Sequence, residues 1–86
     1  MHTINLELLY TESELIFDML EYHQDDLSIL FDTYQTVLQV DPEVIIILLD
    51  YLGPYEDGQD TPEEIQYYGT CIPRLASKLR DIYVMS

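Results

Sequence analysis

Apolar residues recur at alternating spacings of four and three in two stretches of the chain, and this periodicity restricts the fold more than any other feature. Such a repeat places apolar side chains along one face of a helix. The first stretch predicts one helix over residues 12–39 that ends by Val40, with Thr11 and Glu14 forming a capping box. Its apolar face would consist of Ile16, Leu20, His23, Leu27, Leu30, Tyr34 and Val37. The alternative is two helices, separated by a turn at Gln24-Asp25-Asp26 with an aspartate as N-cap.

The second stretch begins with Thr61-Pro62-Glu63-Glu64, which combines a cap, a proline and first-turn acids and therefore indicates a helix start. Pro73 interrupts the repeat, and its ring would press on the carbonyl of Gly69. We expect the helix to kink there because glycine tolerates the distortion. The repeat itself consists of Ile65, Tyr68, Ile72, Leu75, Leu79 and Ile82.

A third helix start lies between these stretches, at Asp41-Pro42-Glu43. The apolar run Val44–Leu49 follows and predicts a buried helix ending near Gly53-Pro54, although its β-branched residues also allow a strand. A polar loop is expected over residues 55–60. Residues 3–10 alternate between polar and apolar like a strand, or form an irregular helical turn. The predicted fold is a single acidic helical domain over residues 1–86, an all-α bundle of three to four helices with a short extended N-terminal segment.

Charge excludes several classes of function. The chain has a formal net charge of −14, and its three bases, Arg74, Lys78 and Arg80, all lie beyond Pro73. We therefore expect no direct binding to nucleic acid or to an anionic membrane, both of which require clustered cations. The favoured partner is a basic protein. Without an apolar run long enough to cross a bilayer or a basic N-terminal segment, the chain is expected to be soluble and cytoplasmic.

Catalysis and metal binding have little support in the sequence. His23 and Cys71 lie on or beside the apolar repeats and are expected in the core, and no apolar stretch isolates a carboxylate pair for acid–base chemistry. Asp57-Gly58 and Glu64 match late positions of a calcium-binding EF-hand loop. The early positions fall on Gly53 and Tyr55, which offer no carboxylate. We expect no enzyme activity, no metal site and no cofactor.

The candidate partner-binding residues are acids that recur at helical spacings, together with two tyrosines. Glu14, Asp18 and Glu21 continue to Asp25 at spacings of four and three, opposite the apolar face, and no lysine relieves their repulsion. Tyrosines beside acids supply rigid contact area of the kind found at interfaces. The predicted set is Glu14, Asp18, Glu21, Tyr22, Asp25, Asp26 and Asp32, with a second patch of Tyr55, Asp57, Asp60, Glu63 and Glu64.

This acidic character resembles that of the DNA-mimic inhibitors of phages and mobile elements, which occupy duplex-binding clefts. The similarity is one of class and not of motif. Tyr10-Thr11-Glu12-Ser13-Glu14 and the segment from Pro54 to Ile65 also resemble parts of the small helical immunity proteins that neutralise nuclease bacteriocins. That family binds its nuclease through an acidic second helix and a Tyr-Tyr-Pro element, whereas Leu52-Gly53-Pro54 stands here. The second resemblance therefore concerns the way of binding a nuclease and does not indicate membership of that family.

The function expected from the sequence is inhibition of a basic nucleic-acid-binding protein, with carboxylates in the place of phosphates. Anti-restriction, anti-CRISPR and repair-enzyme inhibitors act in this way. One alternative is an immunity-type protein that blocks a nuclease toxin at an exosite. Another is an acidic adaptor subunit, or a homodimer, held together by apolar residues outside the repeat. The residues that motivate this alternative are Leu15, Phe17 and Ile29.

Overall fold

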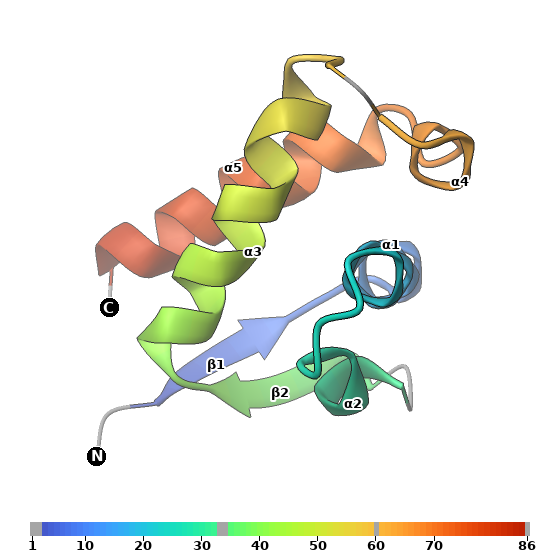
Figure 1. Ribbon diagram of the computed structural model, residues 1–86. Helices are drawn as coiled ribbons and strands as arrows, with labels where there is room; N and C mark the ends of the chain where they lie inside the picture. The colour runs from blue at the N-terminus through green and yellow to red at the C-terminus, as the bar shows by residue number, and fades with distance from the viewer. Residues whose placement is uncertain (1–2, 33–34, 60, 86) are drawn as a thin grey trace.

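The computed structural model describes residues 3–32, 35–59 and 61–85. Helices form most of this part of the chain, and α1, α3 and α5 are the long ones (Figure 1). The prediction of a mainly helical fold with an extended N-terminal segment is confirmed, with a two-stranded sheet in addition. The elements in chain order are β1 (Ile4–Glu7), α1 (Tyr10–Tyr22), α2 (Ser28–Phe31), β2 (Val37–Val40), α3 (Pro42–Glu56), α4 (Glu63–Gln66) and α5 (Cys71–Met85).

The sheet joins two segments that are distant in sequence. β1 runs antiparallel to β2, with Ile4 opposite Val40 and Glu7 opposite Val37. Side chains of β1 alternate between the core and the outside, and Leu6 is completely buried. This alternation is the period of two that a half-buried strand requires, so the strand interpretation of the N-terminal segment is correct.

The single long helix predicted over residues 12–39 is wrong, because α1 ends at Tyr22. Gln24 adopts a left-handed conformation with φ of 56°. Its N–H donates to the carbonyl of Glu21 at 3.0 Å, and the N–H of Asp25 donates to the carbonyl of Leu20 at 2.9 Å. These two bonds define a Schellman motif, which satisfies the last carbonyls of a helix and turns the chain away. The alternative turn at residues 24–26 is therefore correct, but one helical turn and a strand follow it instead of a second long helix.

The start of α1 also differs from the prediction. The helix begins at Tyr10, and the N–H of Leu9 donates to Glu12 Oε1 at 2.8 Å. Glu12 therefore plays the capping role that the sequence analysis assigned to Glu14, and it accepts from the free amide of Leu9. A carboxylate at the third helical position performs this role wherever the helix begins, so a shift of two residues changes which acid is used.

The second apolar repeat is divided in the same way. α4 is a single turn, and Gly69 then takes a left-handed φ of 52° that side chains other than glycine's disfavour. α5 starts at Cys71, which places Pro73 in its first turn, where the missing N–H disrupts no helical hydrogen bond. A kinked continuous helix is thus wrong. The repeat still identifies buried residues, because Ile65, Leu75 and Leu79 are completely buried.

α3 begins after Asp41 as predicted but continues past Gly53-Pro54 to Glu56. It ends in a second Schellman motif, in which left-handed Gly58 donates to the carbonyl of Tyr55 and the N–H of Gln59 donates to the carbonyl of Pro54. Tyr55 and Glu56 therefore belong to the helix and not to the expected loop. A proline this late in a helix leaves only one carbonyl, that of Asp50, without its usual N–H partner.

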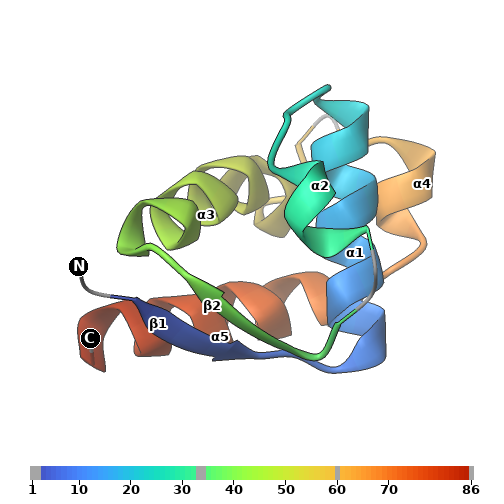
Figure 2. The ribbon, with the colours of Figure 1, turned by 90° about the horizontal axis from the view of Figure 1, so that it is seen from below.

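The core lies between the two-stranded sheet and the long helices. α3 packs along α5, and the sheet lies beneath them in Figure 1. α2 and α4 lie on opposite sides of α1, as Figure 2 also shows. The first repeat misjudges the residues near α2, since Leu30 and Val37 are exposed whereas Phe31 is completely buried. No helix in the described part of the chain is long and apolar enough to span a membrane.

Candidate functional site

Two of the three cations are engaged in ion pairs within the molecule. Lys78 Nζ lies 2.5 Å from Glu12 Oε1, and an Arg80 guanidinium nitrogen lies 2.5 Å from Glu56 Oε2. Both bases belong to α5, so the pairs attach this helix to α1 and α3. Within residues 3–32, 35–59 and 61–85, no other carboxylate has a lysine or arginine nitrogen within 4.0 Å. The surface therefore presents carboxylates whose charge is not compensated by a neighbouring base.

The predicted acidic stripe is not one continuous helical face. Glu14, Asp18 and Glu21 do lie on α1, but Asp25 follows the Schellman motif at its end. Asp26 and Asp32 are exposed on the segment around α2. The spacing that suggested a stripe thus has structural meaning only as far as Glu21.

One hollow brings the two predicted acidic patches together. Asp18, Glu21 and Tyr22 from α1 line it with Glu64 from α4, and its volume is about 360 Å³. The Tyr68 hydroxyl donates a hydrogen bond to Asp18, which fixes this carboxylate in position. Glu64 was assigned to a separate patch, and only the packing of α4 against α1 places it here. We call this group of four residues the acidic hollow.

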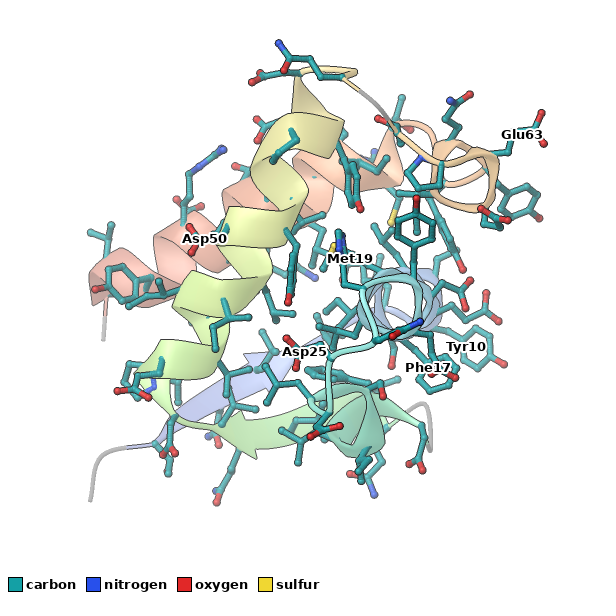
Figure 3. All side chains as sticks on the ribbon, in the orientation of Figure 1. Tyr10, Phe17, Met19, Asp25, Asp50 and Glu63 are labelled. Carbon is teal, nitrogen blue, oxygen red and sulfur yellow. The ribbon has the colours of Figure 1, made fainter. Side chains whose placement is uncertain are left out.

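The other described residues of the second patch lie outside the acidic hollow. Asp57 is exposed at the C-terminal end of α3, and Glu63 is exposed and points away from α1 in Figure 3. Asp60 lies outside the described residues. Asp50 of α3 is also exposed and does not line the acidic hollow. Exposed carboxylates therefore occur outside the acidic hollow as well.

An aromatic cluster joins the end of α1 to α3. The His23 ring stacks on Tyr51, with centroids 4.3 Å apart and planes 12° apart, and it meets Tyr22 edge-on at 5.3 Å. His23 Nε2 and the Tyr55 hydroxyl share a hydrogen bond of 2.5 Å. His23 was predicted in the core but is exposed. Tyr55 was predicted as a surface contact but is only 8% exposed. Tyr22, by contrast, is 58% exposed and available for contact.

Sequence reasoning missed one residue of this cluster, Tyr51. Tyr51 and Tyr55 are four residues apart and share one face of a helix only if α3 continues through Pro54. Because the sequence indicated a helix end at Gly53-Pro54, the pair was divided between a helix and a loop. The tyrosine spacing was the available signal, since it matches one turn of helix on both sides of the proline.

Asp25 stabilises the turn that follows α1. It accepts hydrogen bonds from the Tyr51 hydroxyl at 2.6 Å and from the N–H of Leu27 at 2.9 Å. These donors hold the pKa of Asp25 below its usual value of 3.8, and the same contact raises the pKa of Tyr51. Asp25, predicted as a partner contact, is thus half-buried and engaged within the protein.

We expect Asp25 to contribute stability that depends on pH. Its pKa is lower in the folded than in the unfolded chain, so the contribution is complete above about pH 3.8 and is lost as the pH falls through the lower folded value. The measurement is the free energy of unfolding of the wild type minus that of Asp25→Asn, from neutral pH to well below 3.8. Repulsion among the other carboxylates also makes the free energy of unfolding depend on pH. This contribution is nearly the same in both proteins, so it largely cancels in the difference. A difference that stays constant over this range would contradict the assignment.

No metal or nucleophile site emerges in the described part of the chain. It contains no group of three or more His, Cys, Asp or Glu side chains arranged to hold a metal ion. Gly58, which lies in the partial EF-hand match, ends α3. Cys71 is half-buried, and burial raises the pKa of its thiol, which disfavours the reactive thiolate.

The apolar residues that motivated an adaptor or a homodimer are largely internal. Leu15 is completely buried, and Phe17 is partly buried against the core. Ile29 is 69% exposed. Two of the three residues are thus explained by the packing of the protein itself.

Comparison of the chain with protein-family models, with curated proteins and with solved structures returned no significant match.

Proposed function

We propose that the protein binds the basic nucleic-acid-binding cleft of another protein and blocks it, with its carboxylates in the place of phosphates. The main support is that Lys78 and Arg80 are held in internal pairs while the acids around them stay uncompensated. A basic cleft approaching the acidic hollow therefore meets carboxylates without competition from neighbouring bases. Charge-assisted hydrogen bonds to arginine and lysine are the contacts this chemistry provides.

The amount of charge is comparable to that of a short duplex. The longest dimension of the molecule is 37 Å, and duplex DNA of that length carries about 22 phosphate charges. The chain contains 17 carboxylates. They do not reproduce two regular rows of phosphates, so the proposed mimicry is one of charge density and electrostatic attraction. A field of this strength accelerates association with a basic surface.

The acidic hollow is the best candidate for the centre of contact. Asp18 is held by Tyr68, so part of the site is fixed before binding. Glu21 and Glu64 are exposed and free to rotate toward a cation, and Tyr22 adds apolar area beside them. Tyrosine is among the residues enriched at binding hot spots.

Reversing two charges at this hollow should weaken partner binding by about tenfold. The variant is Glu21→Lys with Glu64→Lys, since both side chains are exposed. Asp18 is a poorer choice because its replacement would also break the contact with Tyr68. The dissociation constant is measured with the partner that the immobilised protein retains from extracts of its own host.

The matched control is Glu7→Lys with Asp81→Lys, which makes the same change in net charge at exposed positions on β1 and α5. Equal weakening by both double variants would show that only net charge matters. Added duplex DNA should compete with the protein for the partner, since a mimic and the duplex share one cleft. Simultaneous binding of both would instead indicate an exosite. Affinity should also fall steeply as salt is added.

A further inference from the structure

A second hollow, beside the aromatic cluster, is distinct from the acidic hollow but shares Tyr22 with it. It has a volume of about 230 Å³, below the range of 300–1,000 Å³ usual for drug-sized ligands, so it suits a single side chain. We call it the aromatic hollow. Its walls come from the end of α1 and the last turns of α3, and they consist of Tyr22, His23, Asp50, Tyr51, Pro54, Tyr55 and Gln59.

The electrostatics of the aromatic hollow favour a cation. The faces of tyrosine rings are negative, and the Tyr51 hydroxyl donates its proton toward the Asp25 carboxylate, which increases the electron density of that ring. Asp50 also lines the hollow and carries a negative charge. The backbone carbonyl of Asp50 is a further acceptor, because Pro54 has no N–H to donate to it. With a net charge of −14 around it, the hollow would repel an anion.

The geometry distinguishes between kinds of cation. A quaternary ammonium group is best enclosed by several open ring faces. Here one face of Tyr51 is covered by the stacked His23 ring, and Tyr55 is buried. The open surfaces are those of Tyr22 and His23. A planar guanidinium can stack on one such ring while its N–H groups donate to a carboxylate.

We propose that the aromatic hollow receives an arginine side chain of a basic partner protein, stacked on Tyr22 or His23 and hydrogen-bonded to Asp50. The inference deepens the proposed function, since it names a partner residue for this end of the surface. It also explains the high exposure of Tyr22, which lies between the two hollows and lines both.

The test uses N-acetyl-arginine methylamide as a probe and its uncharged analogue, N-acetyl-citrulline methylamide, as control. Two-dimensional NMR of the whole protein follows the resonances of Tyr22, His23 and Asp50 during each titration. We expect saturable shifts with the arginine probe and much weaker ones with citrulline. Equal responses to both probes, no saturable shift, or shifts centred on Glu21 and Glu64 would each overturn the proposal. Tighter binding of N-acetyl-trimethyllysine methylamide would overturn the choice of guanidinium.

Variants locate the contact. Tyr22→Ala should weaken probe binding about three- to tenfold, and Tyr22→Phe, which keeps the ring, should bind within about twofold of the wild type. Asp50→Asn should also weaken binding. The control is Tyr67→Ala, which removes a ring that is 84% exposed and does not line the hollow. Weakening by Tyr67→Ala equal to that by Tyr22→Ala would contradict the assignment. Because the probe requires no partner, failure of the DNA competition experiment would leave this result standing, and the reverse also holds.

Discussion

Replacing Lys78 with methionine is expected to lower the free energy of unfolding by about 3 kcal/mol. Its ammonium group lies 2.5 Å from Glu12, and Glu12 is only 3% exposed. The methionine keeps most of the apolar stem but removes the charge. Among the described residues, the N–H of Leu9 is then the one remaining hydrogen-bond donor to this buried carboxylate. Breaking a buried pair from one side is costly for this reason, whereas losing an exposed pair costs little.

Urea denaturation of two further variants distinguishes this effect from a general loss of positive charge. Arg74→Met removes an exposed cation from the same helix and should change the free energy of unfolding by no more than about 0.5 kcal/mol. Adding Glu12→Gln to Lys78→Met should restore part of the stability, because the amide oxygen still accepts from Leu9 without a buried charge. If Lys78→Met proves as stable as Arg74→Met, the pair does not hold α5 in place.

Replacing Phe31 with alanine should cost about 3–4 kcal/mol, the second of the large effects. Its side chain is completely buried, although it belongs to the short helix α2. Loss of so large a side chain removes apolar contact and leaves a cavity that the neighbouring helix α1 cannot fill. Thermal or urea unfolding of the variant measures the cost.

Leu30→Ala is the informative comparison, since Leu30 is 46% exposed and its truncation should cost less than about 1 kcal/mol. A continuous helix over residues 12–39 would reverse this order. In that helix Leu30 lies on the apolar face and Phe31 does not. A larger loss from Leu30→Ala than from Phe31→Ala would therefore refute the arrangement of α2 described above.

Local signals in the sequence predicted the helix starts better than the helix ends. Asp41-Pro42 marks the start of α3 correctly, because a cap and a first-turn proline act through the nearest backbone alone. The end of α1 depends on Gln24 taking a left-handed conformation, which glycine usually supplies and glutamine rarely does. Apolar spacing could not reveal this break, since Leu27, Leu30 and Val37 continue the same repeat beyond it.

The sequence predicted individual residues of the candidate site but not how they come together. Asp18 and Glu21 follow from helical spacing, but their meeting with Glu64 depends on how α4 packs against α1. Tyr22 and Tyr55 were both predicted as partner contacts because acids lie beside them in the sequence. Of the two, Tyr22 is exposed and Tyr55 is buried. The burial of Tyr55 requires α3 to run through Pro54, a choice made by tertiary packing against local preference.

Because of the turn of α3 that follows Pro54, the aromatic hollow can unfold while the rest of the protein stays folded. Tyr51 lies before Pro54 and Tyr55 after it, and the ladder of helical hydrogen bonds between them lacks one rung. Unwinding this end alone would part the two rings and abolish the hollow while Ile45 and Leu48 remain packed inside. The proposed binding of arginine would therefore be lost without denaturation if this last turn of α3 unwound locally.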